Sequence, residues 1–184
     1  MDTPLPTLKR RGRIAGAAFL LAGFVFANAG TLSAVAVARP GLFPTSETAQ
    51  VQEMTAAQAA ARSHLDRFFQ SVIDADGVAR QGAAVRVVLH SLNGRSELIW
   101  VTPFARQGAE YFGTLAATPR QSRGPIQGDL IRFRKPQIVD WSFFGEDGRM
   151  YGNFTTRMIL NTVSPARAAE IAALLSASPA PKDW

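Results

Sequence analysis

Three carboxylates have the side-chain chemistry for acid and base catalysis: Glu97, Asp129 and Asp140. Two carboxyl groups that flank a glycosidic bond can act as acid and as base or nucleophile, so a close pair would suit a hydrolase of glycan or peptidoglycan. Asp129 follows Gly128 and is also a typical turn residue, and a hydrogen bond to a backbone amide or to Arg157 would explain Asp140. We therefore predict no catalytic residue, with this trio of carboxylates as the alternative.

Aromatic and basic side chains form a second candidate site, for binding. Trp100 and Trp141 are expected in the core because tryptophan buries a large area, yet tryptophan is also a common anchor of binding surfaces. Arg132 and Arg134 lie close to Trp141 in the sequence. The predicted binding residues are Trp100, Arg132, Arg134, Asp140 and Trp141.

The sequence gives no support for a metal site or a cofactor. The two histidines, His64 and His90, have no HExxH pattern and no helical spacing to one another, and the chain has no cysteine. The stretch 74–77 begins like a calcium loop, but the twelfth position is Val85 instead of glutamate, so the end of a helix explains it better. Serine-nucleophile, phosphate-loop and dinucleotide motifs are also absent from the sequence.

The amino-terminal segment 1–38 has the anatomy of an export signal. Four basic residues between Lys9 and Arg13 precede the uncharged run 14–38, which contains small-residue sites at Ala27-Asn28-Ala29 and Ala36-Val37-Ala38. The run is long enough to span a bilayer, so an uncleaved anchor in the inner membrane is the alternative. Either interpretation predicts an exported, periplasmic domain, either secreted or anchored by residues 14–38, that contacts membrane only through this segment.

The charge of the remaining chain argues against a nucleic-acid partner. The full chain of 184 residues carries a formal net charge of +6, and removal of 1–38 leaves 16 basic and 13 acidic residues, a net charge of +3. Nucleic-acid binding proteins concentrate positive charge on one face, and export separates a protein from nucleic acid. We expect no nucleic-acid partner.

The sequence favours one domain of the α+β class. After a Pro- and Gly-containing linker, 39–53, apolar residues recur at helical spacing from Met54 to Ile73, with Thr55 as the expected N-cap. The domain is expected to run over 54–178, with a tail at 179–184. Its last helix is predicted after Ser164, an N-cap residue that precedes Pro165.

Short strands separated by turn residues fill the middle of the domain, about five or six by their pattern. Asn93-Gly94 and Asp147-Gly148 are typical of tight hairpin turns, which predicts a mainly antiparallel sheet. Within Gly128–Trp141, alternation places Ile131 and Phe133 on one face of a strand, and Pro136 is expected at a bend. The triplet Asn153-Phe154-Thr155 fits a glycosylation pattern and is interpreted as strand sequence.

Five short motifs in register resemble a bacterial family called domain of unknown function 2314. They are Glu97-Leu98-Ile99-Trp100, Tyr111-Phe112-Gly113, Gly128-Asp129 with Phe133, Ile138 with Asp140-Trp141, and 152–157. The chain departs from the family pattern at Leu98, where histidine is common, and at Ala117, where asparagine is common. The resemblance implies an α+β fold with amphipathic N-terminal and short C-terminal helices packed on a strongly bent sheet, and it implies no reaction.

These observations favour an exported, non-enzymatic domain that binds a protein or a cell-envelope component, with residues of 128–141 contributing. An envelope hydrolase acting through paired carboxylates is the alternative function.

Overall fold

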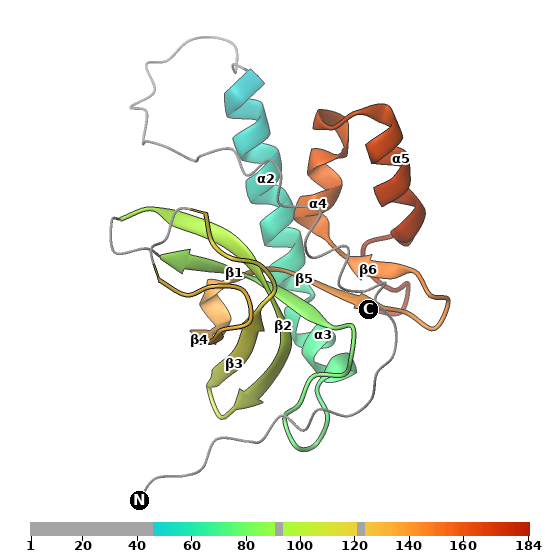
Figure 1. Ribbon diagram of the computed structural model, residues 1–184. Coiled ribbons are helices and arrows are strands. Elements are labelled where there is room, and N and C mark those ends of the chain that lie inside the picture. The colour runs from blue at the N-terminus through green and yellow to red at the C-terminus, as the bar shows by residue number, and fades with distance from the viewer. Residues whose placement is uncertain (1–45, 91–93, 121–123) are drawn as a thin grey trace, which may run out of the picture.

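The computed structural model describes residues 46–90, 94–120 and 124–184 (Figure 1). The expected export segment 1–38 and Asn93 of the first hairpin turn lie outside the described residues. Among the helices described, none has the length and apolar character needed to cross a membrane.

Two helices, α2 (Ser46–Ser63) and α3 (Leu65–Val72), occupy the region where one amphipathic helix was predicted. The helical segment begins at Ser46 instead of Met54, so the second part of the expected linker is helical. A break at His64, with φ of −99° and ψ of 1°, separates the two helices. The predicted apolar stripe is confirmed in α3, where Leu65, Phe68, Phe69 and Val72 are buried.

A six-stranded antiparallel sheet forms the body of the domain, in the order β4-β3-β2-β1-β5-β6. Neighbouring strands along the chain pair as hairpins, except that β5 returns to the far side of β1. The α+β class and the strand number are therefore confirmed for the described residues. The strands are β1 (Ala84–His90), β2 (Ser96–Gln107), β3 (Glu110–Leu115), β4 (Leu130–Arg134), β5 (Ile138–Phe144) and β6 (Met150–Gly152).

The expected strong bend of the sheet is wrong, since the sheet is not strongly curled. Pro136 lies at a bend between two strands, as expected, in a short 3₁₀ helix, η2 (Lys135–Gln137), that connects β4 to β5. These two strands do not pair with each other. The sheet has register shifts between Val101 and Phe104 in β2 and between Arg86 and Val87 in β1.

The C-terminal part of the chain folds into α4 (Phe154–Met158), a 3₁₀ helix η3 (Ile159–Thr162) and α5 (Pro165–Leu174). The predicted cap of α5 is confirmed, because Ser164 accepts a hydrogen bond from the amide of Arg167. The strand interpretation of 153–155 is wrong: Asn153 has a positive φ of 56°, which ends the strand path and starts α4. In Figure 1, α4 stands beside α2, and α5 lies on the far side of α4.

Trp141 of β5 lies at the centre of the aromatic core and is fully buried. Its ring stacks on Phe68 of α3 at a centroid distance of 5.0 Å, and its Nε1 donates a hydrogen bond to the carbonyl of Ala61 in α2. The tail predicted at 179–184 folds back onto this core, where Trp184 packs against Trp141 and Phe143 at 5.4 and 5.5 Å. One tryptophan therefore joins both N-terminal helices, the sheet and the end of the chain.

We expect Gly152→Ala to destabilise the domain strongly. Gly152 has a φ of +75°, and a Cβ there would lie 2.0 Å from the carbonyl oxygen of Trp141. Overpacking of this kind costs about 1–3 kcal/mol, in addition to the cost of the positive φ. The measurement is the free energy of unfolding in urea.

The matched control is Gly148→Ala, because Gly148 also has a positive φ, +71°, but a Cβ there would meet no atom within 4 Å. Equal losses of stability in the two variants would contradict the close packing of β6 on Trp141.

Candidate functional site

The three candidate carboxylates do not converge on one site. Across β1, Glu97 is opposite Leu89 and Asp140 is opposite Arg86, so their side chains leave opposite faces of the sheet. Strand spacings place their Cα atoms about 14 Å apart, and because the two carboxyl groups lie on opposite faces of the sheet they cannot flank one glycosidic bond. Asp129 precedes β4, and three strands separate β4 from β5 in the sheet.

Glu97 and Asp129 each hold a loop by accepting backbone hydrogen bonds. Both carboxylate oxygens of Glu97 accept from the amide of Arg120, at 3.1 and 2.9 Å. Asp129 accepts from the amide of Ile126 at 2.9 Å, in the turn that leads into β4. These contacts match the turn chemistry that the sequence indicated for Asp129.

Asp140 is fully buried and accepts four hydrogen bonds. One comes from the amide of Trp141 at 2.8 Å, and the others come from α4: the amide of Phe154 at 3.2 Å, and the amide and hydroxyl of Thr155 at 2.8 and 2.6 Å. A carboxylate that accepts from the first free amides of a helix acts as its cap. Asp140 therefore caps α4 from a neighbouring strand, and its side chain is closed to solvent.

Arg86 completes this buried polar cluster. Its Nη1 donates to the Thr155 hydroxyl at 2.8 Å, and its guanidinium lies 5.9 Å from the centre of the Trp100 ring. Burial lowers the pKa of Arg86 and raises the pKa of Asp140. The hydrogen bonds from Thr155 and Trp141 oppose the rise in the pKa of Asp140, and the attraction between the two charges opposes both changes.

Both predicted binding tryptophans belong to the interior. Trp100 is 4% exposed and Trp141 is 0% exposed, so neither ring lines an open surface. This placement agrees with their interpretation as core residues.

The two predicted binding arginines lie together on the exposed face of β4. The side chains of Arg132 and Arg134 are 66% and 71% exposed, and both contact the carboxylate of Glu110 in β3, at 3.5 and 3.2 Å. β4 is an edge strand, paired with β3 on one side only. Of the five predicted binding residues, these two alone are accessible.

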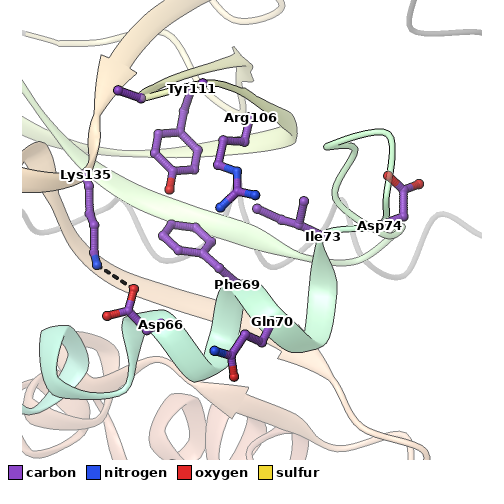
Figure 2. Close-up of a pocket in the computed structure, with 10 residues that line it drawn as sticks. Asp66, Phe69, Gln70, Ile73, Asp74, Arg106, Tyr111 and Lys135 are labelled. Atoms are coloured by element: carbon purple, nitrogen blue, oxygen red, sulfur yellow. Dashed lines mark hydrogen bonds and ion pairs between the residues drawn. The ribbon is translucent and has the colours of Figure 1, made fainter.

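A cleft of about 470 Å³ lies between α3 and the β2–β3 hairpin (Figure 2). We call it the α3 cleft. The sequence did not predict this cleft, although Tyr111 stands in a family motif and Lys135 in the stretch 128–141, because its lining comes from three separate segments of the chain. The lining residues are Asp66, Phe69, Gln70, Ile73, Asp74, Arg106, Gly108, Ala109, Tyr111 and Lys135.

The described parts of the chain contain no group of three His, Asp or Glu side chains placed to bind a metal ion. His64 stacks on Phe154 at 5.9 Å, and His90 contacts the Ser96 hydroxyl at 2.8 Å. Asp74 accepts from the amides of Asp76 and Val78, which is the geometry of a turn at a helix end.

The fold and the buried polar cluster define a small α+β domain whose sequence motifs serve mainly its architecture. The motif residues Asp140-Trp141 and 152–157 meet at the cap of α4. The chain belongs to the family called domain of unknown function 2314 (DUF2314), described as an uncharacterized protein conserved in bacteria, whose model matches residues 51–174. Neither a curated protein nor a solved structure matches the chain.

We expect Asp140→Asn to lower the free energy of unfolding by about 2–4 kcal/mol, because the amide group cannot accept every hydrogen bond and leaves Arg86 without a buried counter-charge. Urea unfolding measures the effect.

Glu97→Gln and Asp129→Asn are the comparison variants, and each should cost less than about 1 kcal/mol, since Glu97 is a partly exposed residue of β2 and Asp129 is exposed in the turn before β4. A fully stable Asp140→Asn variant would contradict the structural role of this carboxylate.

Proposed function

We propose that this chain is an exported binding domain, and that it captures an acidic protein or cell-envelope component through the exposed face of β4. The observation that carries the proposal is the pair of exposed arginines, Arg132 and Arg134, on an edge strand. We call the patch formed by Ile126, Leu130, Arg132 and Arg134 the β4 surface.

The β4 surface combines charge with apolar area. Ile126 is 56% exposed and Leu130 is 50% exposed, and they are two of the four large hydrophobic residues found exposed in the described chain. Leu130 shares a face with both arginines, because residues two apart in a strand point the same way. Arginine at the centre of an apolar patch is typical of binding hot spots.

The edge of β4 adds backbone groups to this surface. An edge strand has N–H and C=O groups with no strand partner, and an extended segment of another protein can pair with them. Basic side chains beside such an edge favour a segment rich in aspartate or glutamate. This combination supports a protein partner with an acidic extended segment, or an anionic envelope polymer.

Glu110 limits the positive charge of the β4 surface, because it contacts both arginines. An acidic partner has to compete with this carboxylate for the same donors. Affinity should therefore depend on Glu110 in the direction opposite to its dependence on the arginines.

We expect Arg132→Glu/Arg134→Glu to reduce capture of the partner from envelope extract by about tenfold or more, since it replaces attraction with repulsion at two contacts. Glu110→Gln should increase capture a few-fold. The measurement is quantitative affinity capture on the immobilised chain, repeated at high salt, which should weaken binding.

The matched control is Arg67→Glu/Lys182→Glu, which makes the same change in net charge at exposed residues elsewhere. Equal capture by the β4 double variant and the wild type would exclude the β4 surface as the binding site. An equal loss of capture in the control would show that net charge alone accounts for the effect.

Export of the domain is part of the proposal and rests on the basic cluster and the uncharged run 14–38. Residues 1–38 fused before an alkaline phosphatase that is active only outside the cytoplasm should give active enzyme in a bacterial host. Leu21→Arg/Val25→Arg should abolish this activity, because each arginine at the centre of an apolar segment costs about 2.5–3.5 kcal/mol of insertion. Equal activity of the two fusions would contradict export by this segment.

A further inference from the structure

The floor of the α3 cleft is a stack of aromatic rings. Tyr111 stacks between Phe69 at 4.9 Å and Phe133 at 5.6 Å. Tyr111 and Phe69 are only 4% and 5% exposed, so the rings are held firmly by the core. In Figure 2 the Tyr111 hydroxyl and the Arg106 guanidinium both point into the space above Phe69. A rigid floor with polar groups at its rim is the usual build of a small-molecule site, and the cleft has the volume of one.

The charged side chains around the α3 cleft differ in the partners that they have. Lys135 forms an ion pair with Asp66, with the Nζ and Oδ1 atoms 2.5 Å apart. Asp74 accepts two backbone amides of its own turn. Arg106 has no carboxylate within ion-pair distance among the residues that the structure describes. The guanidinium of Arg106 is therefore the cation of the cleft that remains available to a ligand.

Two features fix Arg106 and Tyr111 as a pair. They are cross-strand partners in the β2–β3 hairpin, so their side chains leave the same face of the sheet side by side. The amide of Arg106 also donates to the carbonyl of Gly77 at 2.7 Å, which holds this end of β2 against the turn after α3. The pair is thus positioned before any ligand arrives.

The Tyr111 hydroxyl is a hydrogen-bond donor at neutral pH. Burial raises the pKa of Tyr111, and the positive charges of Arg106 and Lys135 and a hydrogen bond from Arg106 oppose this change. A neutral phenol can donate one hydrogen bond, and a guanidinium carries five N–H donors in a planar fork that matches a carboxylate or a phosphate.

We propose that the α3 cleft binds a small organic anion, whose carboxylate or phosphate group is held by the Arg106 guanidinium and the Tyr111 hydroxyl and whose apolar body rests against Ile73 and the edge of Phe69. The β2–β3 turn, Gly108 and Ala109, forms the rim. Gly108 has a φ of +61°, and a Cβ there would meet no atom within 4 Å, so the rim is open. This site lies on the α3 side of the sheet and is separate from the β4 surface.

Three probes with the same ring test the proposal by ¹⁵N NMR titration of the full chain: benzoate, phenyl phosphate and the neutral benzyl alcohol. We expect saturable shifts of the Gly108 and Ala109 amides with at least one of the anions and not with the alcohol. Saturation by one anion alone assigns the group, carboxylate or phosphate. Shifts that do not saturate with either anion, or equal binding of benzyl alcohol, would overturn the proposal.

Variants identify the side chains. Arg106→Gln should weaken binding of the anion at least tenfold, and Tyr111→Phe, which keeps the ring in the stack, should weaken it about three- to tenfold. Arg132→Gln, on the β4 surface, should bind the anion like the wild type, so that failure of this site and failure of the β4 surface remain distinguishable. Unchanged affinity in Arg106→Gln would also overturn the proposal.

Discussion

The Asp140 carboxyl group lies out of reach of solvent, where an oxygen without a hydrogen bond costs several kcal/mol. It meets that requirement with donors from two elements, β5 itself and the start of α4. The next residue, Trp141, points to the other side of the sheet and donates to Ala61 of α2. Two adjacent residues of β5 therefore fix α4 and α2, and the arrangement of helices around the sheet depends on them.

Because of this constraint, the residues that hold the fold together are different from the residues that solvent can reach. Asp140, Trp141 and Thr155 are all buried, so the family motifs that contain them support the fold. The accessible groups lie farther along the sheet, around β3 and β4. There, alternation sends Arg132 and Arg134 to one face and Phe133 to the other, where Phe133 supports the ring of Tyr111. One strand thus contributes to the β4 surface and to the α3 cleft from its opposite faces.

Local patterns in the sequence predicted most of the elements but not their neighbours in space. The strands, the cap at Ser164 and the turn at Gly148 follow from alternation, capping chemistry and positive φ, which nearby residues decide. The strand order does not, because the pairing of β5 with β1 joins segments far apart in the chain. The role of Asp140 stayed open for the same reason. Its partners Phe154 and Thr155 come within hydrogen-bond distance because Asn153 adopts a positive φ and turns the chain. The alternating pattern of this stretch predicted a continued strand and did not indicate the turn.

The contacts of β5 also order events during folding. The β1–β2 and β2–β3 hairpins join residues close in sequence, whereas α2 meets β5 through the bond between Ala61 and Trp141, 80 residues apart. Non-local contacts of this kind form late, because closing a long loop costs entropy before the contact is gained. During synthesis, which proceeds from the N-terminus, the chain can form these hairpins early. It cannot close its core until β5 has been made. Closure of the core therefore depends on the arrival of β5, and a hairpin that forms before that strand lacks its final packing.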